Sequence, residues 1–228
     1  MARHSTFTKP VVEPIADGQY PAIIYQLIDL GSQKFSKDGR EWYSPQRLIG
    51  FEIPGLTYEN KDGESISKVI SITAFDSLNP TKNGQIGQRE VIDAVAGSAN
   101  WDEDAVMDYD LDKLIGAQVM LTIAGAESKG KVYQNIIAIE SMPKDMPLTP
   151  IREKVSVTID DFVSLESLDL PEWIKNKIAA SKEYQDHKNF VAIRDEGEVS
   201  QVQMSGEVSS FESDPALRDE IKLEDVPF

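Results

Sequence analysis

Five stretches of this chain carry the alternating apolar and polar residues that are typical of β-strands, and their order limits the folds open to it. They lie at residues 18–30, 42–53, 67–75, 117–124 and 132–142. Asp38-Gly39 predicts a turn within a polar loop over residues 32–41, between the first two strands. Pro45 predicts an edge position or a bulge in the second strand, because proline cannot donate a ladder hydrogen bond.

Between the third and fourth strands, the spacing of the apolar residues changes from the period of a strand to that of a helix. Residues 88–96 place Val91, Ile92 and Val95 on one helical face, and Gly97 is a favourable C-terminal cap. A second short helix is expected over Leu111–Ile115. Three strands, a helical insert and two strands follow the order of an OB-fold, a five-stranded barrel with its helix between strands three and four.

Three segments are expected: an OB-fold domain over residues 1–150, a helical extension over 151–190 and a disordered acidic tail over 191–228. In the extension, Asp169 to Glu172 is interpreted as a capping box for a helix that starts near Pro171. Its apolar face would contain Leu170, Trp173, Ile174 and Ile178. Packing on the same chain is the expectation, because short isolated helices are marginal in water.

The formal net charge of −16 argues at first against binding a polyanion. The acids are concentrated, however. Residues 191–228 hold ten acids and three bases, and residues 101–112 hold six acids and no base. The rest of the first 153 residues is nearly neutral, so the charge of the whole chain does not exclude a local nucleic-acid site.

Basic residues gather with aromatic residues in two places, which lie around residues 34–47 and 129–133. Cations that follow phosphates and rings that stack on bases are what single-stranded nucleic acid requires. In an OB-fold the loops that join strands one to two and four to five flank the ligand, so the two clusters are expected on one face. The alternative is that they are charged hairpin tips with strand aromatics facing a core.

The chain ends in acids, a proline and a terminal aromatic, a compact element for recruiting a partner. These residues are Glu224, Asp225, Val226, Pro227 and Phe228. The ending EDVPF is similar to the DDIPF ending of bacterial single-stranded DNA-binding proteins. The segments YPAIIYQLIDLGSQ, DLDKLIGAQV and KVYQNIIAIESM resemble phage-encoded members of that class.

This resemblance implies a protein that coats and protects single-stranded DNA during phage replication, recombination and repair, with a tail that recruits replication and repair proteins. It implies no catalysis and no cofactor, and a location in the cytoplasm of a bacterial host. The candidate DNA-binding residues are Lys34, Phe35, Lys37, Arg40, Trp42, Tyr43, Arg47, Phe51, Lys68, Lys129, Lys131 and Tyr133. Trp42 and Tyr43 point to opposite faces of a regular strand, and which one faces the ligand is left open.

Other functions find less support in the residues. The chain has no cysteine, and Asp108, Asp110 and Asp112 open an EF-hand pattern that Lys113 and Val119 break, so neither a thiolate metal site nor a calcium loop is expected. No glycine-rich phosphate loop, membrane span or signal peptide is found. A homo-oligomer is possible. The alternatives are an acidic DNA mimic or a protein-only adaptor that inhibits or tethers host nucleic-acid enzymes.

Overall fold

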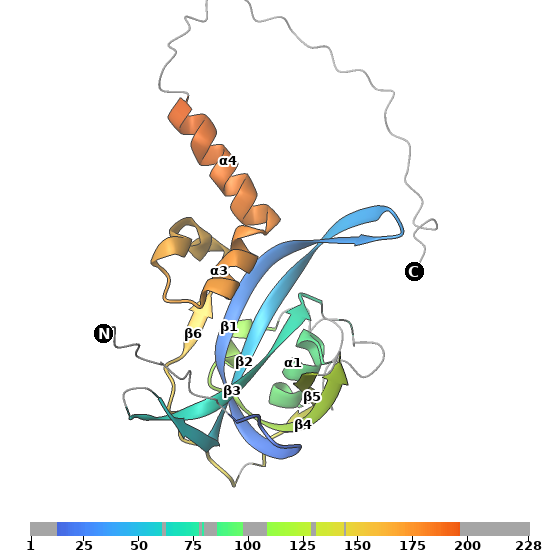
Figure 1. Ribbon diagram of the computed structural model, residues 1–228, viewed down its shortest axis with the longest axis vertical. Coiled ribbons are helices and arrows are strands. Elements are labelled where there is room, and N and C mark those ends of the chain that lie inside the picture. The colour runs from blue at the N-terminus through green and yellow to red at the C-terminus, as the bar shows by residue number, and fades with distance from the viewer. Residues whose placement is uncertain are drawn as a thin grey trace, which may run out of the picture. The chain divides into compact units, whose positions relative to one another are not determined.

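The computed structural model divides the chain into two units, residues 1–191 and 192–228, and the fold described below belongs to the first (Figure 1). The residues that the structure describes are 13–60, 63–77, 79, 86–97, 109–128, 131–143 and 145–196. Within these residues the protein is mainly β, as the sequence predicts.

The strands described form one six-stranded sheet in which β3-β2-β1-β4-β5 are neighbours in that order. The bounds are β1 Gly18–Lys37, β2 Arg40–Glu59, β3 Ser65–Phe75, β4 Gln118–Ser128, β5 Lys131–Ser141 and β6 Val155–Val157. The five long strands pair antiparallel, whereas β6 pairs parallel with the middle of β1.

The expected order of strands and helical insert is confirmed. Helix α1 (Gln88–Ala96) follows β3 and ends at Gly97, whose N–H donates to the Asp93 carbonyl, and the 3₁₀ turn η2 (Leu111–Leu114) precedes β4. The sheet is not closed into a barrel by hydrogen bonds, because no pairing joins β3 to β5 among the described residues. The core under it contains Ile24, Phe51 and Ile92.

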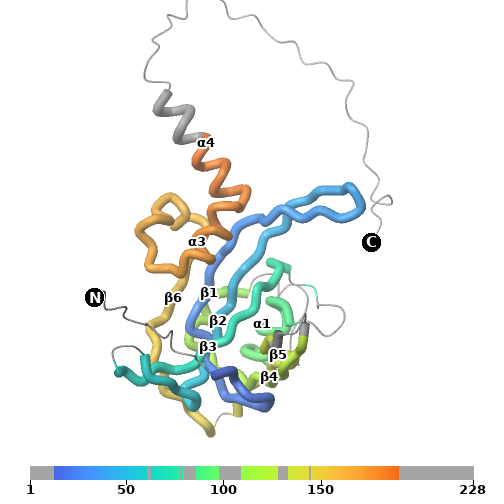
Figure 2. The backbone as a smooth tube through the Cα atoms, in the orientation of Figure 1, coloured from blue at the N-terminus to red at the C-terminus, as the bar shows by residue number. Residues whose placement is uncertain are grey.

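The expected polar loop over residues 32–41 is wrong. The first strand continues to Lys37 and the second begins at Arg40, so only Asp38 and Gly39 form the turn. Both have a positive φ, 52° and 77°, which is the conformation of the two-residue turns that match the twist of a hairpin. Since β3 pairs with β2 only up to Gln46, the ribbon beyond that point has two strands and projects past the sheet (Figures 1 and 2). We call residues 32–45 the arm.

A second core lies where the helical extension covers β1 and β2. It contains Ile28, Leu30, Leu48, Val157, Phe162, Leu165, Ile174 and Ile178. Its helical parts are η3 (Ile159–Ser167), α3 (Glu172–Ala179) and the first turns of α4 (Lys182–Glu196). The expected packing of the extension on the same chain is therefore confirmed.

Details of the extension differ from the sequence prediction. Pro171 is the N-cap of α3 and no side chain caps it, so the capping box through Asp169 is wrong. Trp173 is 52% exposed rather than buried beside Ile174. Helix α4 runs to residue 196, which is past the expected start of the tail. None of the helices in the described residues is both long and apolar enough to cross a bilayer.

Candidate nucleic-acid interface

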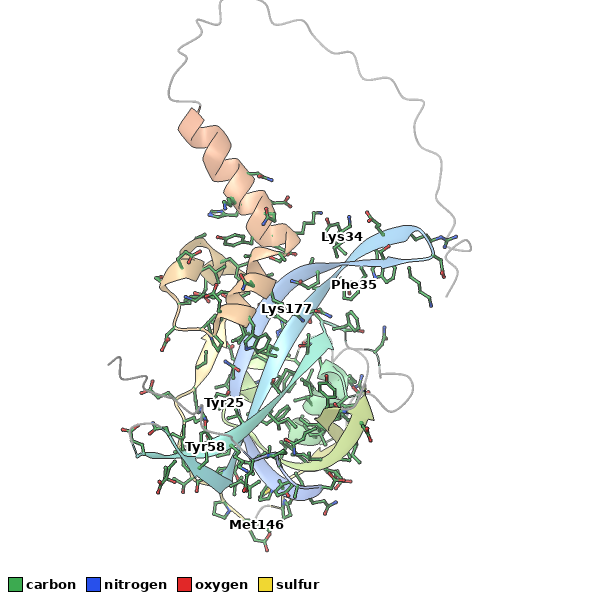
Figure 3. All side chains as sticks on the ribbon, in the orientation of Figure 1. Tyr25, Lys34, Phe35, Tyr58, Met146 and Lys177 are labelled. Atoms are coloured by element: carbon green, nitrogen blue, oxygen red, sulfur yellow. The ribbon has the colours of Figure 1, made fainter. Side chains whose placement is uncertain are left out.

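The two faces of the arm carry different side chains. Phe35 pairs with Trp42 and Lys37 with Arg40 across the ribbon, and alternation places these four residues on one face, which we call the ring face. Lys34 pairs with Tyr43 on the other face. Figure 3 shows the side chains of Lys34 and Phe35 on opposite sides of the ribbon.

The ring face carries a cluster of three aromatic side chains. The Phe35 and Trp42 rings stack with their centroids 5.8 Å apart and 20° between their planes, and the Phe75 ring lies 5.5 Å from Phe35. Trp42 is 44% exposed and Phe75 48%. These rings leave broad surfaces to the solvent, which is the property that base stacking requires. Of Trp42 and Tyr43, it is Trp42 that lies in this cluster.

Phe75 is a candidate that sequence reasoning missed. It ends β3, and its strand partner is Gln46, the first residue of β2 that pairs with β3. The signal available in the sequence is alternation with Ser71 and Thr73, which marks Phe75 as an outward-facing ring at the end of its strand.

Cations on the two faces differ in their surroundings. On the ring face, Lys37 and Arg40 are exposed near the turn. On the opposite face, Lys34 Nζ lies 2.7 Å from a Glu41 carboxylate oxygen, and this hydrogen bond raises the pKa of Lys34. Lys34 therefore stays charged, but the adjacent Glu41 carboxylate offsets part of that charge, so its attraction for a phosphate is weaker than that of an unpaired cation.

The opposite face of the arm meets the helical extension. Lys182 Nζ lies 5.9 Å from the centre of the Tyr43 ring, a cation–π distance. Ser32 and Gln33 at the root of the arm also donate hydrogen bonds to the extension, to the Glu183 carboxylate and the Lys177 carbonyl. The extension thus holds the root of the arm, where Gln33 lies on the ring face by alternation, and further out its contact is with Tyr43 on the opposite face.

Two expected DNA contacts are corrected by the structure. Phe51 is fully buried in the core. Arg47 is 8% exposed and donates to Asp29 at 2.6 Å, to Asp76 at 3.2 Å and to Gln88. Its guanidinium is occupied by a buried network that ties β1, β2 and α1 together, so neither residue presents a surface to a ligand.

The remaining candidates lie elsewhere. Lys68 is near the other end of β3, on the opposite face from Phe75, and its Nζ donates to the Glu13 carbonyl. Tyr133 is exposed on β5. Lys129, the side chain of Lys131 and the tail residues 224–228 lie outside the described residues. The expected meeting of the two basic clusters on one face stays a prediction, because the basic side chains of the second cluster lie outside the described residues.

The outer face of β2 next to the arm is covered by the protein itself. Leu48 is buried in the second core. Further along the strand, the buried Glu52 carboxylate accepts from the Ile151 and Arg152 backbone N–H groups at 2.8 and 3.2 Å. A ligand that follows the ring face is therefore directed along β3, whose outward residues stay exposed.

Comparison with protein-family models and with curated proteins gave no match for this chain. Within the described ranges, no group of three or more histidine, aspartate or glutamate side chains is placed to hold a metal ion.

Proposed function

We propose that this chain is a non-catalytic single-stranded DNA-binding protein, and that its open sheet with the insert between β3 and β4 is an OB-fold. The observation that carries the proposal is the ring face of the arm. Phe35, Trp42 and Phe75 offer stacking surfaces there, and the exposed side chains of Lys37 and Arg40 supply cations beside them. This is the combination that non-specific binders of single strands use.

The resemblance of the C-terminal residues suggests the biological setting of the proposal. In it, the protein coats DNA during phage replication, recombination and repair in the bacterial cytoplasm. Residues 224–228 recruit replication and repair proteins, with Phe228 filling a pocket on the partner. The acidic tail is a separate module that competes with DNA, and the sheet and arm that bind the DNA are nearly neutral.

A fluorescence anisotropy titration of labelled oligothymidylate with the full chain tests the proposed function. Binding is expected at low salt and is expected to weaken as salt rises. If about four phosphates are contacted, the slope of log K against log salt is about −3. A full chain that leaves the oligonucleotide free at every salt concentration contradicts the proposal and is the behaviour of an acidic DNA mimic or a protein-only adaptor.

A further inference from the structure

A cleft of about 570 Å³ opens between the unpaired edges of β3 and β5. Its volume falls within the range of about 300–1,000 Å³ that is usual for small-ligand sites. It is lined by Ser71, Ile72, Thr73, Ile86, Gln134, Asn135, Ile136 and Ile137.

The side chains that line the cleft are all uncharged. Hydroxyl groups of Ser71 and Thr73 and amides of Gln134 and Asn135 supply hydrogen-bond donors and acceptors, and the isoleucines supply apolar surface. A phosphate group is bound best by cationic side chains, and none of the residues that line this cleft is cationic. A nucleobase is flat, uncharged and edged with donors and acceptors, so the lining matches a base rather than the backbone.

The cleft follows the ring cluster along β3. Alternation along β3 puts Ser71, Thr73 and Phe75 on one face, and all three are exposed. Two residues of a strand span about 7 Å, so Phe75 lies about that far along β3 from Thr73, the last cleft residue of this strand. A strand stacked on Phe75 would reach the cleft with its next bases.

Tyr133 lies at the other end of the same cleft. Each step in the order β3-β2-β1-β4-β5 is antiparallel, so β3 and β5 run in the same direction. Phe75 is therefore past the last cleft residue of β3, and Tyr133 is before the first cleft residue of β5. Tyr133 is 51% exposed and shares its strand face with Asn135.

We propose that this cleft is a base-binding subsite of the DNA site, which receives unpaired bases that leave the rings of the arm at Phe75. The proposal rests on the proposed function. Thr73 and Asn135 hydrogen-bond to base edges, and Tyr133 stacks on the base that leaves the far end. The subsite extends the DNA path from the arm to β5 and assigns a role to Tyr133.

The absence of cysteine from the chain allows a direct test. Asn135→Cys introduces a single thiol at the cleft, and Glu140→Cys introduces one at an exposed position further along β5. Each variant is alkylated with and without saturating oligothymidylate of about 16 nucleotides. This length is the upper end of the range of site sizes known for one OB-fold. The DNA is expected to slow alkylation of the Asn135→Cys thiol at least about fivefold and to leave the Glu140→Cys thiol unchanged.

The outcomes separate this proposal from the proposed function. If anisotropy shows that the oligonucleotide binds the Asn135→Cys variant and the thiol still reacts at its free rate, the subsite is wrong while DNA binding stands. If no oligonucleotide binds the unmodified full chain, the proposed function fails. Equal protection of both thiols also contradicts the subsite, because it indicates a general shielding of β5.

A second measurement does not depend on the thiol. Thr73→Val and Tyr133→Ala remove a hydroxyl and a ring from the proposed path. With the 16-nucleotide probe, the pair is expected to weaken binding by about tenfold, whereas a probe of about four nucleotides, held by the rings of the arm, loses less than about twofold. An equal loss for both probe lengths contradicts a subsite beyond the arm.

Discussion

The carboxylate of Glu183 accepts two hydrogen bonds from Ser32, one from its backbone N–H and one from its hydroxyl, each 2.6 Å long. Gly31, the residue before Ser32, has a φ of 67°, and a Cβ on it would lie 2.6 Å from the Ser181 Cβ. Only glycine allows both this backbone conformation and this approach. The start of α4 therefore holds the root of the arm at a fixed place.

Glu183→Ala is expected to loosen the arm. Charge-assisted hydrogen bonds are stronger than neutral ones, but this carboxylate is partly solvated, so a loss of about 1 kcal/mol in unfolding free energy is expected at pH 7. Fluorescence anisotropy of Trp42, in a background where Trp101 and Trp173 are phenylalanine, is expected to fall. Unchanged Trp42 anisotropy contradicts a role of Glu183 in holding the arm.

The effect of Glu183 depends on pH in a defined direction. Desolvation raises the pKa of Glu183, but the hydrogen bonds from Ser32 outweigh it and hold the pKa below the ordinary value of 4.5. A depressed pKa stabilises the fold above that ordinary value, and the stabilisation is lost as the pH falls through the folded-state pKa. The difference in unfolding free energy between wild type and Glu183→Gln is thus expected to be constant near pH 7 and to shrink below pH 4.5.

The arm cations are expected to contribute unequally to DNA binding. Lys37→Ala with Arg40→Ala removes two contacts and reduces the magnitude of the salt slope by about 1.4, at about 0.7 for each phosphate of a single strand. Lys34→Ala has a smaller effect, because Lys34 is paired with Glu41. Lys68→Ala, which removes one cation from outside the ring face, is the control, and each slope is compared per charge removed. Equal slopes for the double variant and the control would show that the cations of the arm do not contact the DNA.

Trp42→Ala and Phe75→Ala are each expected to weaken single-stranded DNA binding by about 1–3 kcal/mol, the usual value of one stacked base. Both rings are about half exposed, so the fold tolerates their loss better than that of a core ring. Affinity is measured by the anisotropy titration. Trp173→Ala, which removes an exposed ring from α3, is the control, and a loss as large as that of Trp42→Ala argues against stacking on the arm.

Arg47 is expected to matter for stability rather than for DNA contact. Arg47→Ala leaves Asp29 and Asp76 without their buried partner, but Asp76 is 40% exposed, so the unfolding free energy is expected to fall by about 2–3 kcal/mol. Chemical denaturation measures the loss. Under conditions where the variant remains folded, its salt slope should equal that of wild type, and a reduced slope would show that Arg47 contacts a phosphate.

The acidic C-terminal segment is expected to compete with DNA. Residues 197–228 hold eight acids and two bases, and a tethered segment can reach an effective concentration in the millimolar range. Truncation after residue 196, which keeps α4, should therefore tighten DNA binding. Deletion of Phe228 alone should leave DNA affinity unchanged and abolish capture of replication proteins. Weaker DNA binding by the truncated chain contradicts competition.

Local patterns in the sequence were enough for the strand order, for α1 and for the turn at Asp38-Gly39. Each depends on residues within a few positions of one another, where side-chain period and backbone preference act directly. The same reasoning identified Phe35, Lys37, Arg40 and Trp42 as residues of one candidate site, because they lie close to a single turn.

Tertiary structure decided which of these residues are exposed to a ligand and which residues from other strands and helices lie beside them. Arg47 resembles a surface cation in the sequence, but its partners Asp76 and Gln88 come from later elements that pack around it. Phe75 joins Phe35 only through the register of β3 on β2. The root of the arm is held by the contact between Ser32 and Glu183, which are 151 residues apart. A contact at that separation forms through the packing of distant elements rather than through any local preference.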